Sequence, residues 1–235
     1  MKFSLMKRVV SEFFGTALLL AAVVGSGIMG EQLSGGNVAL ALLVNSLATG
    51  AALVALILAF GPISGAHFNP AVTLADASQG GIRWALVPAY LGAQSAGAIS
   101  GVFAAHAMFG QKIFQTSLHV RHGTPQLISE AIATFGLLAA IWGCSRFKID
   151  AIPFAVGAYI TAAYWFTAST SFANPAVTLA RCFTNTFAGI RPKDALAFMV
   201  AQLLGAFAAT LLFRWLAPAL AEKAPEILVA HDRNS

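Results

Sequence analysis

The heptapeptide Asn-Pro-Ala-Val-Thr-Leu-Ala occupies residues 69–75 and recurs without change at residues 174–180. Both copies lie in connections between long apolar stretches. An Asn can cap the free N–H groups of a helix, and Pro suits the first helical position because it has no N–H to leave unpaired. Each copy therefore predicts a short helix that begins inside a connection and is capped by Asn69 or Asn174.

Six apolar stretches are long enough, or nearly long enough, to cross a membrane. A helix needs about 20 mostly apolar residues to cross about 30 Å of hydrocarbon. Only 10% of this chain is charged and 58% is hydrophobic, whereas a soluble domain is about 25% charged. The expected solvent is therefore the lipid bilayer, and the expected spans are roughly 9–30, 38–60, 84–108, 126–147, 152–168 and 195–216.

Several classes of function are excluded by the same pattern. The net charge of +5 does not indicate a nucleic-acid partner, because the basic residues stand singly between apolar runs. Cys144 and Cys182 lack metal or redox spacing. No nucleophile–base set, metal cluster or nucleotide-binding loop is present. We therefore expect no enzyme activity, no cofactor and no metal site.

The spans divide into two units of three, at about residues 1–118 and 119–235. Because three is odd, the second unit must enter the membrane upside down, which gives the inverted repeat common among transport proteins. Short polar pairs recur at matching places in the two units. They are Ser11-Glu12 with Ser129-Glu130, and Ala93-Gln94 with Ala201-Gln202.

The orientation follows from the Lys and Arg residues in the connections. With the N-terminus inside the cell, the inner side holds nine of them and the outer side holds five. Basic residues favour the cytoplasmic side. We expect a multi-pass protein of the plasma membrane with both termini in the cytoplasm.

Each repeated motif supports about ten helical residues, or about 15 Å of helix, half of the hydrocarbon thickness. Each connection can therefore re-enter the membrane as irregular backbone and return as a half-helix, if it lines a watery cavity. Two such half-helices would meet with the positive ends of their dipoles facing one point in a pore. Side-chain N–H groups of Asn69 and Asn174 would hold a neutral solute there. The alternative is that each motif is only a helix cap in a loop.

With these motifs the chain resembles the aquaporin and aquaglyceroporin family over almost its whole length. The resemblance implies an all-α membrane protein with six transmembrane helices and two re-entrant half-helices in two inverted three-helix repeats. It also implies a homotetramer with four pores that conduct neutral small molecules passively. The residues that carry it are Ser11-Glu12-Phe13-Phe14-Gly15-Thr16, Ser64-Gly65-Ala66-His67-Phe68-Asn69-Pro70-Ala71, Glu130 and Phe172-Ala173-Asn174-Pro175-Ala176.

The resemblance further implies which backbone carbonyls line the pore. These belong to Gly65, Ala66 and His67 in the inner half, and to Thr170, Ser171 and Phe172 in the outer half.

Two carboxylates inside expected spans, Glu12 and Glu130, are costly there and need partners. We expect them to brace backbone N–H groups of the re-entrant loops, although Glu12 lying at the membrane interface is the alternative. His67 is expected to line the inner vestibule, with a helix-packing role as its alternative. Gln94 and Gln202 are expected to bond between helices.

The family narrows its pore with four residues, and family spacing places them here at Thr49, Ala162, Ser171 and Val177. Nearly all members carry an Arg directly after the second Asn-Pro-Ala, where this chain has Val177. Arg181 is the nearest downstream base, one helical turn further on, and we do not assume that it substitutes. Four small residues predict a wide, less polar constriction without a fixed positive charge.

A wide constriction suits a bulky neutral solute such as glycerol or arsenous acid. The pattern resembles the bacterial aquaglyceroporins associated with arsenic-resistance operons. Glycerol channels of the family usually carry an Asp shortly after the second motif. That Asp is also missing here, because Val177-Thr178 stands in its place. We expect a channel for glycerol-like solutes, trivalent arsenic as arsenous acid or methylated arsenicals, and water. The alternatives are a plain water or glycerol facilitator and, from another class, a membrane adhesion or scaffold protein.

Overall fold

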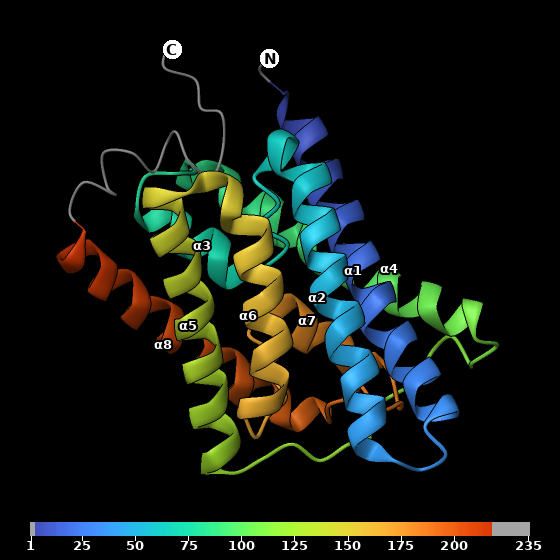
Figure 1. Cartoon of the computed structure of the whole chain (residues 1–235). Coiled ribbons are helices and arrows are strands. Elements are labelled where there is room, and N and C mark those ends of the chain that lie inside the picture. Colours follow the sequence, from blue (N-terminus) through green and yellow to red (C-terminus); the bar gives the residue numbers. More distant parts are fainter. Residues whose placement is uncertain (1–2, 218–235) are drawn as a thin grey trace.

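The computed structural model describes residues 3–217, and these residues form helices and connections without strands. Figure 1 shows the long helices standing side by side, with two short helices enclosed among them. The long helices are α1 (Leu5–Leu33), α2 (Val38–Ser64), α4 (Val87–Met108), α5 (Thr124–Phe147), α6 (Ile152–Phe166) and α8 (Pro192–Leu216). The short helices are α3 (Pro70–Ser78) and α7 (Pro175–Ala180), with 3₁₀ turns at Trp84–Leu86, Ile149–Ala151 and Arg181–Phe183.

Five helical segments in the described part of the chain are long and apolar enough to cross a membrane: α1, α2, α5, α8 and the segment Ile149–Phe166 that contains α6. Helix α4 has 22 residues, so it is also long enough to span. Its sequence is rich in Gly, Ala and Ser and includes Gln94 and His106, both fully buried. Its low hydropathy therefore reflects packing against protein. The predicted six spans and two half-helices are confirmed.

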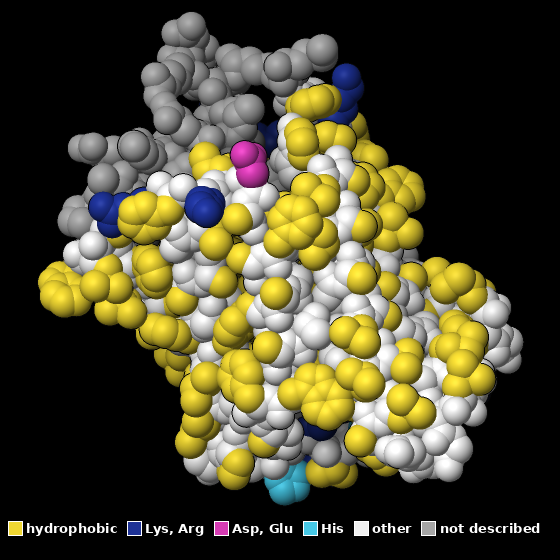
Figure 2. Space-filling view, in the orientation of Figure 1, with side chains coloured by type: hydrophobic (Ala, Val, Ile, Leu, Met, Phe, Trp, Pro, Cys, Tyr) yellow, Lys and Arg dark blue, Asp and Glu magenta, His cyan; other side chains and the backbone are white. Residues whose placement is uncertain are grey.

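The two repeats are built alike. Helix α1 packs against α2 and α4, and α5 packs in the same way against α6 and α8. The repeats meet where α2 packs against α6 and where α3 contacts α7. Exposed Leu, Phe, Val and Trp side chains cover the visible face of the molecule, with charged side chains gathered near its ends (Figure 2). Such a surface suits contact with lipid.

Glycines allow the closest of these helix contacts. A Cβ at Gly101 of α4 would collide with the backbone carbonyl of Ala17 in α1. In the second repeat, a Cβ at Gly205 of α8 would collide with the backbone carbonyl of Ala131 in α5. Membrane helices use small residues for such close approach. The tight pairs α1–α4 and α5–α8 fix the frame into which the two short helices fit.

The half-helices are shorter than the ten residues expected for each. Helix α3 has nine residues, whereas α7 has six and tightens into the 3₁₀ turn Arg181–Phe183. Tight 3₁₀ turns are common at helix ends. This early ending of α7 positions Arg181 in the site described below.

A cavity between the two asparagine caps

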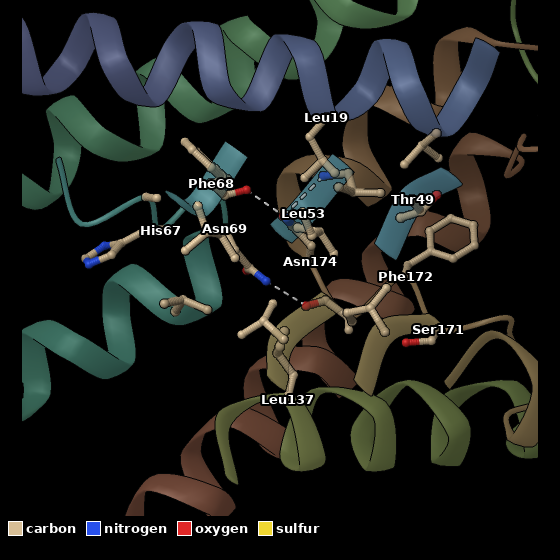
Figure 3. Close-up of a pocket in the computed structure, with 18 of the residues that line it drawn as sticks. Leu19, Thr49, Leu53, His67, Phe68, Asn69, Leu137, Ser171, Phe172 and Asn174 are labelled. Carbon is tan, nitrogen blue, oxygen red and sulfur yellow. Dashed lines mark hydrogen bonds between the residues drawn. The ribbon is translucent and has the colours of Figure 1, made fainter. Parts of the chain in front are cut away.

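A cavity runs past the N-termini of α3 and α7. In Figure 3, His67 lies toward one side of it, Thr49 and Ser171 lie toward the other, and Asn69 and Asn174 lie between them. We call these two sides the His67 end and the Arg181 end, since Arg181 also lines the cavity and its guanidinium lies over the ring of Phe172, the residue after Ser171. Much of the wall is apolar, contributed by Leu19, Val23, Leu53, Ile57, Val72, Leu137, Ile141, Ile152, Val156 and Ile160.

Each asparagine caps its own half-helix and also contacts the opposite repeat. Asn69 Oδ1 accepts from Ala71 N at 2.9 Å, and Asn174 Oδ1 accepts from Ala176 N at 2.9 Å. Asn69 Nδ2 donates to the carbonyl of Ala173, and Asn174 Nδ2 donates to the carbonyl of Phe68, each at 2.8 Å. An amide NH₂ carries two hydrogens. Each asparagine that lines the cavity therefore keeps one hydrogen for a solute.

The loops before the asparagines share an uncommon backbone. Gly65, Ala66 and Phe68 have positive φ, and so do the residues 105 positions later, Thr170, Ser171 and Ala173. Left-handed geometry at a non-glycine residue costs of order 1–3 kcal/mol and needs support from its surroundings.

Pro70, Ala71, Pro175 and Ala176 are buried at the helix starts and are not part of the cavity wall. Gly65, Ala66, His67, Ser171 and Phe172 line the cavity, whereas Thr170 does not.

Two buried carboxylates support the left-handed backbone of the two loops that precede Asn69 and Asn174. Glu12 accepts from the backbone N–H groups of His67 at 3.0 Å and Phe68 at 2.8 Å. Glu130 accepts from those of Phe172 and Ala173, both at 2.9 Å. Both side chains are fully buried. Hydrogen bonds to charged groups are stronger than neutral ones, so each carboxylate offsets the strain of its own loop.

An amide joins each carboxylate to the adjacent half-helix. Gln94 Nε2 donates to Glu12 at 2.8 Å and to Thr73 Oγ1 at 2.9 Å. In the second repeat, Gln202 Nε2 donates to Glu130 at 2.6 Å and to Thr178 Oγ1 at 2.8 Å. Each glutamine therefore links its long helix both to the buried carboxylate and to the half-helix.

At the His67 end, the imidazole meets the half-helix α3. His67 Nδ1 lies 3.1 Å from Thr73 Oγ1, and Nε2 lies 3.6 Å from the carboxylate of Asp76. Asp76 is fully buried and does not line the cavity. These contacts fix the ring orientation of a histidine that does line it.

The constriction residues are only partly where family spacing placed them. Thr49, Ser171 and Val177 line the cavity, but Ala162 does not and is exposed on α6. The α6 residues in the wall recur every four positions and end at Tyr164, so Ala162 lies on another face of the helix. Tyr164 OH lies 3.3 Å from Thr49 Oγ1. The expectation that Ala162 lines the pore was therefore wrong, and Tyr164 of the same helix lines the cavity instead.

An arginine also lines the cavity, contrary to the expectation of a site without one. Arg181 is 2% exposed, and its Cζ lies 3.4 Å from the centroid of the Phe172 ring. Its Nε donates to the carbonyl of Ala188. The signal in the sequence was the four-residue spacing from Val177, which puts both on one face of a helix.

Arg121 is a second arginine at this end, and no sequence motif marks it. It belongs to the connection between the repeats, and its Nε donates to Gly189 O at 2.8 Å. Its Nη1 donates to Ser169 O at 3.1 Å, next to Thr170. Burial lowers the pKa of Arg121, an effect that the nearby Glu130 opposes. Arg121 therefore braces the second re-entrant loop from behind the cavity wall.

Comparison with known proteins gives one consistent picture. The family model described as "Major intrinsic protein" matches residues 1–148 and 143–234. The aquaglyceroporin AqpS of Rhizobium meliloti (strain 1021) is 54% identical over 229 residues, which are 96% of this chain and 98% of that protein. The probable aquaporin NIP7-1 of Arabidopsis thaliana is 38% identical over 105 residues, covering 45% of this chain and 37% of its own length.

A solved structure supports the fold. The X-ray structure of the aquaglyceroporin from Plasmodium falciparum has a TM-score of 0.73, covers 93% of this chain and 99% of its own, and is 24% identical. The resemblance inferred from the paired motifs is thereby confirmed. Since the family model matches both repeats and a relative more than half identical spans nearly the whole sequence, the chain belongs to the major intrinsic protein family.

Proposed function

We propose that this channel conducts small neutral solutes passively, with glycerol-like molecules, arsenous acid or methylated arsenicals, and water as its permeants. Family membership and the AqpS relative support a channel for water and glycerol rather than an enzyme. The observation that carries the solute class is the mixed wall of the cavity. Its lining combines apolar side chains with asparagine amides and the irregular loops before them.

Such a wall matches a polyol better than an ion. A polyol has a C–H surface and several hydroxyls, so the apolar and the polar groups of the lining both find a counterpart on it. An ion must lose its hydration shell at an apolar wall, and the N-termini of α3 and α7 oppose cations. Arsenous acid is neutral at pH 7 and resembles glycerol in shape, so the same wall suits it.

The width of the constriction is part of the proposal. Val177 directly follows the second Asn-Pro-Ala, and it lines the cavity beside Thr49 and Ser171. A branched three-carbon side chain occupies less space there than a guanidinium on a long stem. Tyr164 narrows the same region, with its hydroxyl turned to Thr49. We infer that the space spared at Val177 admits solutes larger than water.

The channel is further proposed to assemble as a homotetramer in the plasma membrane with both termini in the cytoplasm. The exposed apolar faces of the long helices are available to lipid and to neighbouring subunits. Native mass spectrometry of the detergent-solubilised protein measures the subunit number, and labelling of single cysteines in intact cells measures the orientation.

Stopped-flow flux of water, glycerol and arsenite in proteoliposomes tests the function. Wild-type protein is expected to pass all three, and Val177→Arg is expected to reduce glycerol and arsenite flux far more than water flux. Val120→Arg adds an arginine at an exposed position outside the cavity and serves as the matched control. An unchanged glycerol-to-water ratio in Val177→Arg overturns the assigned constriction.

The same experiment separates the alternatives. Water flux without glycerol or arsenite flux indicates a plain water channel, and water and glycerol flux without arsenite flux indicates a plain glycerol facilitator. No flux above that of empty liposomes, from correctly inserted protein, favours a scaffold.

A further inference from the structure

Arg181 is a buried cation in the cavity wall that the repeated motif does not explain. Its side chain is 2% exposed, and it shares the wall with Val177, Ser171 and Thr49. Within residues 3–217, no carboxylate forms an ion pair with it. An unpaired charge is costly to bury unless other groups stabilise it. The arrangement around Arg181 therefore indicates a specific role.

Two contacts hold the guanidinium and leave part of it free. Nε donates to the carbonyl of Ala188, and the Phe172 ring lies 3.4 Å from Cζ. A cation over an aromatic face is favourable when it is desolvated. Neither Nη group has a hydrogen-bond partner among residues 3–217. The guanidinium is therefore fixed along one edge, while the donors of its other edge remain available to the cavity that Arg181 lines.

The position of Arg181 differs from that of its counterpart in the first repeat. Arg181 follows Val177 by four residues, or about 6 Å along a helix. The equivalent pair 105 residues earlier is Val72 and Asp76. Val72 lines the cavity, but Asp76 does not. A cation therefore projects into the wall only in the second repeat, and the inverted symmetry does not require it.

A second unpaired polar group lies in the same part of the wall. Ser171 Oγ is buried and has no hydrogen-bond partner in the described part of the chain. Arg121 is different, because its Nε and Nη1 donate to Gly189 and Ser169 and it lies outside the cavity wall. Arg181 and Ser171 thus both offer free donors at this end of the cavity.

We propose that Arg181 is a specificity-determining residue which excludes cations and donates hydrogen bonds to the oxygens of the permeating solute. This proposal rests on the channel function given above and assigns its charge selectivity. Val177 then sets the width of the constriction, and Arg181, one helical turn further on, sets its fixed charge. A neutral solute with two or more oxygens can accept from the guanidinium and from Ser171 in turn, whereas a cation meets a fixed positive charge.

Proteoliposomes of wild type, Arg181→Met, Arg181→Gln and Arg83→Met test the assignment. Arg83 is exposed and outside the cavity, so Arg83→Met controls for the loss of one arginine. Sodium and proton leak are measured together with glycerol and water flux. In Arg181→Met, cation leak is expected to rise about tenfold or more, because a fixed charge acts more strongly in a narrow site enclosed by protein than in bulk water. Glycerol flux is expected to fall relative to water flux.

The other variants separate charge from hydrogen bonding and guard against misfolding. Arg181→Gln keeps an N–H donor, so its cation leak is expected to rise while glycerol flux is retained better than in Arg181→Met. The double variant Arg181→Met/Val177→Arg returns a charge to the same cavity one turn away, so its cation leak is expected to fall back toward wild type. If Arg181→Met does not insert, Arg181→Gln and the double variant carry the test.

Residual ion leak in the wild type gives a reading that needs no variant. Chloride is expected to leak faster than sodium, and a leak that favours sodium overturns the proposal. Unchanged cation leak in inserted Arg181→Met or Arg181→Gln also overturns it. Glycerol flux in the wild type shows that the channel function itself stands, so the two failures are distinguishable.

Discussion

Replacing Glu12 by Ala tests whether the buried carboxylates hold the re-entrant loops in place. Glu12 accepts from four donors: the backbone N–H groups of His67 and Phe68, the Ser64 hydroxyl and the Gln94 amide. Ser64 is also bonded to Ser11, and Gln94 is also bonded to Thr73. The backbone N–H groups of His67 and Phe68 have no other acceptor in Glu12→Ala, so they are the two donors counted below, although the Ser64 hydroxyl and one Gln94 N–H lose their acceptor as well.

The expected loss follows from those two groups. A buried donor without a partner costs about 1–3 kcal/mol, so the pair costs about 2–6 kcal/mol. Ala66 and Phe68 also lose the support for their positive φ of 48°. For a chain of this size, such a loss lowers the melting temperature by roughly 4–24 °C. The loss acts on folding, so the solute selectivity of the surviving protein is expected to be unchanged.

Thermal unfolding of the detergent-solubilised protein measures this loss, and size-exclusion chromatography shows whether the assembly survives. Glu31→Ala removes an exposed carboxylate from the same helix and serves as the control. Glu130→Ala is expected to behave like Glu12→Ala, because Glu130 braces Phe172 and Ala173 in the same way. Melting temperatures for both buried variants equal to that of Glu31→Ala would refute the reasoning.

Further predictions concern the constriction, the helix contacts and the hydrogen bonds of Gln202. Thr49→Phe is expected to reduce glycerol flux more than water flux by size alone, leaving cation leak unchanged in the same liposome assay. Gly101→Ala is expected to lower the yield of folded protein, because the new Cβ meets the backbone of Ala17, whereas Gly92→Ala on the same helix has open space and is expected to match wild type on size-exclusion chromatography. Gln202→Ala is expected to lower the free energy of unfolding by about 1–3 kcal/mol, and with it the melting temperature, because the Gln202 amide joins Glu130 to Thr178; a melting curve that coincides with wild type contradicts this.

The sequence by itself determined the architecture, because membrane solvent leaves few choices. Backbone groups in hydrocarbon must be paired internally, so long apolar stretches become helices. The number of stretches and their length set the spans. The duplication of the Asn-Pro-Ala motif, with an odd number of spans in each unit, set the inverted repeat. Local capping chemistry then predicted that helices begin after Asn69 and Asn174, and they do.

The lining of the constriction was decided only by the tertiary structure. Whether Ala162 or Tyr164 faces the cavity depends on how α6 is rotated about its axis, which its packing against α2 and α5 sets. Whether Arg181 faces lipid, a loop or the cavity depends on where α7 ends and on the Ala188 carbonyl and Phe172 ring that receive it. A helix rotation of one residue is about 100°, so spacing along the chain cannot choose between neighbouring faces. Contacts between segments far apart in sequence make that choice.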